Sequence, residues 1–80
     1  MVLTDGSIGS KYCVMDISLN RETEYRLEAL GLTFGSNIEI INKKKNGSLM
    51  VRIRGTRFAM GKDIANGISV ESLSKSGEYL

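Results

Sequence analysis

A helix that has to stop at a glycine and lead directly into a strand is the strongest constraint on how this chain folds. The segment Arg-Leu-Glu-Ala-Leu-Gly-Leu at 26–32 has the pattern of a last helical turn followed by its stop signal. Gly31 can take the positive φ that usually ends a helix, without the steric penalty that other residues meet. We expect Leu32 to fold back onto Leu27 or Ala29, the apolar contact that often accompanies this cap. Helix, stop, turn and the strands that follow indicate a small half-open barrel.

Alternating apolar residues on both sides of the helix predict the strands. The first strand is expected between Ile8 and Leu19. Because side chains alternate along a strand, this segment is expected to place Cys13, Met15 and Ile17 on the inner face. The other expected elements are a helix at 20–30 capped by Asn20, strands at 38–43, 49–54 and 57–60, a helical turn at 62–66, and a closing strand at 68–70.

Two glycine-containing pairs mark the tight turns between neighbouring strands. Asn46-Gly47, at the tip of the 44–47 hairpin, favours a type I′ turn, because both central residues of that turn need positive φ. Gly55-Thr56 suits a type II′ turn, which has glycine at its first central position. The strands joined by these turns are therefore predicted to form an antiparallel meander.

Length and composition limit the chain to one small domain. With 80 residues, of which 41% are hydrophobic, it can build a single compact core. We expect this domain over 1–73 and a polar, flexible tail over 74–80. No apolar run approaches the roughly 18 residues that span a membrane, and Met1–Asp5 lacks the features of a secretory signal. One cysteine, Cys13, cannot form an internal disulfide, which suits a reducing cytoplasm.

Side chains for catalysis and tight metal binding are scarce. The chain has no histidine, the side chain best suited to proton transfer near neutral pH. It carries no phosphate-binding glycine motif, and no pair of carboxylates is spaced for acid–base work. A specific transition-metal site needs clustered imidazole or thiolate ligands, which are missing. Asp16, Glu22 and Glu24 could weakly hold a hard cation, but they fit an acidic bias at a helix N-terminus more simply. We therefore expect no enzyme, no cofactor and no metal site beyond weak divalent binding.

The charge distribution is uneven, although the net charge is only +2. Seven of the eleven basic residues lie between Ile40 and Lys62, and none of the nine acidic residues falls in that window. Such asymmetry indicates either an anionic partner or simply solvated outer faces of hairpins. Nucleic-acid barrels usually interleave aromatic side chains with positive charge, and only Phe58 does so here, which disfavours that partner. The candidate partner-binding residues are Lys43, Lys44, Lys45, Arg52, Arg54 and Arg57.

The ordered set of apolar residues and glycines resembles the ferrous iron transport protein A (FeoA) family over roughly Leu3 to Val70. This resemblance implies a mainly β fold, a small SH3-like barrel of about five strands. One α-helix is expected between its first and second strands, and a short helical turn before its last strand. The chain lacks proline, which the family often carries in the hairpin after the second strand. The residues that carry the resemblance are Leu3, Gly9, Val14, Ile17, Arg26, Leu27, Leu30, Gly31, Leu32, Gly35, Ile38, Ile40, Val51, Ile53, Gly55, Ala59, Met60, Ala65, Ile68 and Val70.

The resemblance also implies a function. A member of this family is expected to be a cytoplasmic, non-enzymatic accessory protein of ferrous iron uptake. It would modulate the membrane ferrous iron transporter (FeoB-like) by contact with its cytoplasmic portion, as a monomer or a weakly self-associating protein, without inserting into the membrane. Two alternatives remain open. One is a metal-sensing module related to the terminal domain of iron-dependent repressors, and the other is a small basic nucleic-acid-binding barrel.

Overall fold

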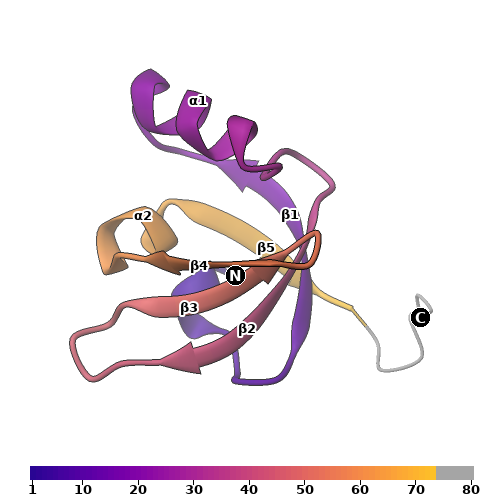
Figure 1. Ribbon diagram of the computed structural model, residues 1–80, viewed down its shortest axis with the longest axis vertical. Helices are drawn as coiled ribbons and strands as arrows, with labels where there is room; N and C mark the ends of the chain where they lie inside the picture. Colours follow the sequence, from indigo (N-terminus) through magenta and orange to yellow (C-terminus); the bar gives the residue numbers. More distant parts are fainter. Residues whose placement is uncertain (74–80) are drawn as a thin grey trace.

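One antiparallel sheet with the strand order β4-β3-β2-β1-β5 makes up most of the structure. The computed structural model describes residues 1–73, so the predicted tail at 74–80 lies outside the described residues. The sheet curls, and β5 returns to pair with β1, while α1 stands above one end of the barrel (Figure 1). In chain order the elements are η1 (Leu3–Asp5), β1 (Lys11–Ile17), α1 (Arg21–Ala29), β2 (Asn37–Lys43), β3 (Leu49–Ile53), β4 (Thr56–Met60), α2 (Lys62–Asn66) and β5 (Ile68–Ser72).

The core fills the inside of the curled sheet. Alternate residues of β3 point inward, and Leu49, Val51 and Ile53 are all buried. Phe58 and Met60 of β4 also face the core, with Phe58 half-buried and Met60 buried. The remaining buried apolar residues are Leu3, Tyr12, Val14, Leu27, Leu32, Ile38, Ile40, Ala65, Ile68 and Val70. One continuous apolar cluster therefore connects every strand and both α-helices.

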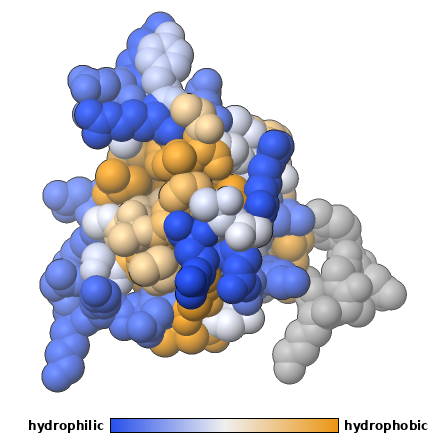
Figure 2. All heavy atoms as spheres, viewed as in Figure 1, coloured by the Kyte–Doolittle hydropathy of each residue, from blue (hydrophilic) through white to orange (hydrophobic). Residues whose placement is uncertain are grey.

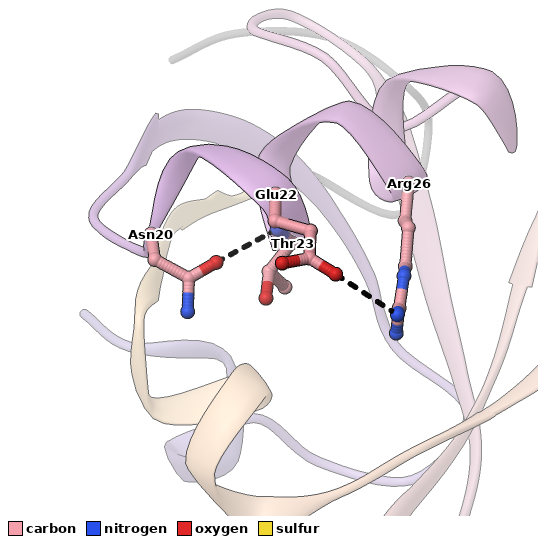
Figure 3. Close-up of polar contacts among 4 residues, drawn as sticks. All are labelled: Asn20, Glu22, Thr23 and Arg26. Carbon is pink, nitrogen blue, oxygen red and sulfur yellow. Dashed lines mark hydrogen bonds and ion pairs between the residues drawn. The ribbon is translucent and has the colours of Figure 1, made fainter.

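The helix α1 begins and ends as its sequence predicts. The side-chain Oδ1 of Asn20 accepts a hydrogen bond of 2.8 Å from the backbone N–H of Thr23, the usual N-cap contact (Figure 3). At the other end, Gly31 has φ 96°. Its N–H donates to the carbonyl of Glu28, and the N–H of Leu32 donates to that of Leu27. This pair of bonds is the Schellman motif, and it leaves Leu32 fully buried.

The first strand is shorter than predicted, and its inner face is different. It covers Lys11–Ile17, because Gly9 at φ 86° lies in a turn before it. The prediction that Cys13 lies on the inner face is wrong, since Tyr12 and Val14 are the buried residues and Cys13 is half-buried. The reason is a bulge between Val14 and Asp16 in the pairing with β5. The extra residue reverses which alternate residues face inward. Before the bulge Tyr12 and Val14 face the core, and after it Ile17 does, so Cys13 and Ile17 do not share a face.

Both hairpin turns differ from the predicted types. Strand pairing of Ile53 with Thr56 leaves Arg54 and Gly55 as the two-residue loop, and their φ values of 52° and 81° make it a type I′ turn. In the other hairpin only Gly47 has positive φ, at 93°. Its N–H donates to the carbonyl of Lys44, which gives a turn over residues 45–46 followed by a glycine bulge.

A second bulge lies in the pairing of β2 with β3. Ile40 pairs with Val51 and Asn42 pairs with Met50, so Ile41 is the extra residue. Ile40 stays fully buried and Asn42 stays exposed across the irregularity. The bulge thus bends the strand while keeping the core side chains on the inner face.

Candidate functional site

Four of the six predicted partner-binding residues lie at the two ends of β3, and the other two lie within β3 and β4. Lys43, Lys44 and Lys45 lie at the hairpin that joins β2 to β3. Arg54 lies in the turn between β3 and β4, at the other end of β3 (Figure 1). A five-residue strand at ~3.3 Å per residue separates the two turns by about 16 Å. The basic residues therefore form a band along the β2–β4 hairpins and not one compact patch.

Arg52 and Arg57 lie between these two ends, directly opposite each other on β3 and β4. Like charges in this position repel each other. The guanidinium of Arg52 turns to the other side and donates a 3.0 Å hydrogen bond to Glu39 on β2. Arg57 forms no ion pair within residues 1–73. Of the two, Arg57 is thus the one whose charge stays available to a partner.

Arg54 lies against the end of α1. A Cβ placed on Gly31 would meet the Cδ of Arg54 at 3.1 Å and its Nε at 3.4 Å. The guanidinium group therefore lies near the C-terminal end of the helix, where a positive charge is favourable. This contact brings the β3–β4 turn next to α1.

An apolar groove of about 150 Å³ separates α1 from β4 and α2. Its walls include Leu27 of α1 and Leu30 at the C-cap of that helix. Ile53 of β3, Phe58 of β4 and Ile64 of α2 complete the apolar lining. Leu30 is 45% exposed and adds its side chain to this apolar surface. Figure 2 shows hydrophobic side chains gathered below α1, with hydrophilic side chains around them. The groove is an exposed apolar surface that the sequence analysis did not identify as a site.

Charged side chains of α1 lie along one edge of the groove. Arg26 lines it and also forms a 3.4 Å ion pair with Glu22, one turn earlier on the helix (Figure 3). Both side chains are well exposed, so this pair contributes little to stability. With Arg54 at the end of the helix, the groove has positive charge near two of its edges.

The acidic residues considered as a weak cation site do not come together. Within residues 1–73, no group of three or more cysteine, aspartate and glutamate side chains is close enough to hold a metal ion. Asp16 is exposed on β1, and Glu22 pairs with Arg26. In the same residues, no helix is both long and apolar enough to cross a membrane.

Taken together, these features define a small barrel of five antiparallel strands with an apolar groove and a basic band. The FeoA domain family model matches residues 1–72. The chain therefore belongs to the FeoA domain family, which comprises small accessory domains related to ferrous iron transport and is not a known enzyme family.

Relatives with this domain include proteins and solved structures. A protein of Methanocaldococcus jannaschii, provisionally named Fe(2+) transport protein A, is 29% identical over 70 residues, which cover 88% of this chain and 84% of that protein. The crystal structure of an iron uptake regulatory protein (FeoA) has a TM-score of 0.83 at 29% identity, covering 91% of this chain and 97% of that chain.

A further structure is the FeoA of Stenotrophomonas maltophilia complexed with zinc, described as a prokaryotic SH3 domain protein and as a candidate ferrous iron transport activating factor. It has a TM-score of 0.76 at 25% identity, and the match covers 89% of each chain. The predicted SH3-like fold, with one helix after the first strand and a short helix before the last, is confirmed.

Proposed function

We propose that this protein is a cytoplasmic, non-enzymatic accessory protein that modulates a membrane ferrous iron transporter by binding its cytoplasmic portion. The observation that supports this proposal is membership of the FeoA domain family, whose relatives carry names linked to ferrous iron transport. An exposed apolar groove beside unpaired positive charge gives the barrel a surface suited to a protein partner.

The proposed contact surface combines the predicted basic residues with the groove. Arg26 lines the groove itself, and Arg54 brings a second positive charge to the end of α1. Arg57 adds a third on the outer face of β4, opposite to the face of its neighbour Phe58, which lines the groove. Lys43–Lys45 extend the surface along the hairpin at the other end of β3. The partner segment should therefore present an apolar side chain flanked by acidic residues.

An NMR titration tests this surface. The ¹⁵N-labelled protein would be titrated with the purified cytoplasmic domain of the cognate transporter, and amide shifts would be followed for each residue. We expect shifts in 43–57 and around Leu30. The double variant R54E/R57E should weaken binding at least about tenfold, because it reverses two charges that face an acidic partner.

A matched charge reversal elsewhere provides the control. Lys11 and Arg21 are exposed and belong to neither the basic residues nor the groove, so K11E/R21E should leave the affinity unchanged within about twofold. Equal weakening by both double variants would contradict the proposed surface. Absence of any shift at millimolar concentration would contradict the partner.

Metal binding is the second candidate, and the zinc complex of the S. maltophilia relative favours it. The donor atoms within residues 1–73 suit only a weak site, since they include one thiol and scattered carboxylates. Calorimetry with Zn²⁺ and Fe²⁺ separates the two candidates. One ion per chain bound more tightly than about 1 µM would favour this second function.

A further inference from the structure

A second cleft, of about 410 Å³, lies away from the apolar groove, between the β2–β3 hairpin, α2 and η1. Lys43 and Lys44 line it from the hairpin, and Lys62 lines it from the first residue of α2. Thr4 of η1 and Asn66 at the end of α2 also line it. Two separate segments of the chain, the hairpin and α2, thus place lysines at one cleft.

The charges around this cleft are unbalanced. Its lining carries three ammonium groups and one carboxylate, that of Asp5. None of the three lysines forms an ion pair within residues 1–73. The lining is therefore positive on balance, and such a cleft raises the local concentration of anions.

The walls of the cleft are held by specific contacts. A Cβ on Gly47 would meet the Cδ of Lys62 at 2.7 Å, so the stem of this lysine lies directly against the tip of the hairpin. The hairpin itself is closed by the 2.9 Å bond from the N–H of Lys44 to the carbonyl of Ser48. In the same lining, the hydroxyl of Thr4 donates to Oδ1 of Asn66 at 2.7 Å, which leaves the amide NH₂ of Asn66 free to donate.

We propose that this cleft binds the phosphate chain of a small polyphosphate or nucleoside triphosphate. Lysine ammonium groups bind phosphate as compact point charges, and three of them at one cleft suit a ligand that carries several negative charges along a short chain. Among the described residues 1–73, no aromatic side chain lines the cleft, so this lining offers a nucleobase no surface on which to stack. Recognition therefore rests on the phosphates and is independent of the base. This site goes beyond the proposed contact with a transporter.

The test is calorimetric titration of the full chain with inorganic triphosphate, ATP and GTP, using citrate as an anion without phosphorus. We expect the three phosphates to bind within about threefold of one another and citrate to bind at least about tenfold more weakly. If ATP or GTP bound more than about tenfold tighter than inorganic triphosphate, the proposal that the phosphates alone are recognised would be overturned.

Single lysine variants locate the site. Lys62→Gln removes a charge that lines the cleft and is not one of the proposed transporter-binding residues. It should weaken triphosphate binding at least about tenfold, as expected for the loss of one charge-assisted contact. Lys45→Gln is the matched control, because Lys45 belongs to the same hairpin as Lys44 but does not line the cleft. It should change the affinity less than about twofold.

Two outcomes would overturn the proposal. One is that Lys62→Gln and Lys45→Gln weaken triphosphate binding equally, which would mean that triphosphate is attracted diffusely to the whole basic band. The other is no detectable binding of triphosphate at millimolar concentration in low salt. Lys43 and Lys44 belong to both proposed surfaces. The transporter contact is nevertheless tested separately, since this titration contains no transporter and Lys62 lies outside that contact surface.

Discussion

At the scale of single residues, two glycines with positive φ differ in how much space surrounds them. Gly31 has φ 96°, and the side chain of Arg54 lies close to where a Cβ would be. Gly35 has φ 85°, and nothing lies within 4 Å of the corresponding position. Both positions require a backbone that alanine adopts at a cost, but only the first also requires a neighbour to move.

Alanine substitutions at these glycines should both destabilise the fold. We expect Gly31→Ala and Gly35→Ala each to lower the free energy of unfolding by about 1–2 kcal/mol, the cost of a non-glycine residue in the left-handed region. Gly31→Ala should also shift the NMR signals of Arg54, and Gly35→Ala should not. Urea unfolding measures the first effect.

A rescue variant controls for the cause of this loss. Asparagine tolerates the left-handed region better than alanine, so Gly35→Asn should recover part of the stability. If Gly35→Ala is as stable as the unchanged protein, the positive φ at this position is not required.

At the scale of elements, α1 is attached to the barrel by few side chains. Leu27 is the buried residue of this helix, at 6% exposure, whereas Tyr25 and Leu30 are largely exposed. The nine residues of α1 are too few for a stable isolated helix in water. Its persistence therefore depends on Leu27 together with the caps at its two ends.

Removing the Leu27 side chain should release the helix before the sheet. We expect Leu27→Ala to cost about 2–5 kcal/mol, as for other buried leucines. Hydrogen exchange should show amides 23–30 losing protection while those of β2 and β3 keep most of theirs.

Leu30→Ala is the matched control on the same helix. Leu30 is 45% exposed, so its truncation should change stability by no more than about 0.5 kcal/mol. Uniform loss of protection across the whole chain in Leu27→Ala would contradict independent opening of α1.

The elements also show what the sequence could predict. The helix end was predicted in detail, because Asn20, Gly31 and Leu32 act through contacts within a few residues. The turn types were not, because the register of β3 against β4 decides which two residues form the loop. The inner face of β1 was misassigned for a related reason, since a bulge that shifts the alternation leaves no mark in the apolar pattern.

At the scale of the whole molecule, one small core supports the fold. At the usual 0.05–0.15 kcal/mol per residue, a chain of 80 residues has roughly 4–12 kcal/mol of stability. Ile40 is fully buried at the centre of the sheet, between β1 and β3. A cavity at the position of Ile40 would therefore remove a substantial part of the total free energy of unfolding.

Truncation of this central side chain should therefore bring the protein close to unfolding. We expect Ile40→Ala to lower the free energy of unfolding by about 2–5 kcal/mol, measured by urea or thermal denaturation. Ile8→Ala, at a position that is 56% exposed, should change it by no more than about 0.5 kcal/mol. Equal effects of the two variants would mean that burial at position 40 does not govern stability.

The candidate surfaces are also determined by the fold of the whole molecule, so the sequence predicted them only in part. The run of basic residues indicated a charged surface, but it did not show that β3 separates the lysines from Arg54. The groove joins residues as distant in sequence as Leu27 and Ile64. Lys62 joins the second cleft because α2 packs beside the hairpin. Such juxtapositions arise from the tertiary fold and have no local sequence signal.

The bulge at Ile41 has a consequence for how strand length can vary in evolution. Ile40 and Asn42 keep their partners on β3 on either side of the extra residue. Deleting position 41 would therefore restore a regular ladder without moving any other side chain to the opposite face. A deletion elsewhere in β2 would reverse the faces of the residues beyond it. Alignments of related sequences should place single-residue gaps in this strand at position 41.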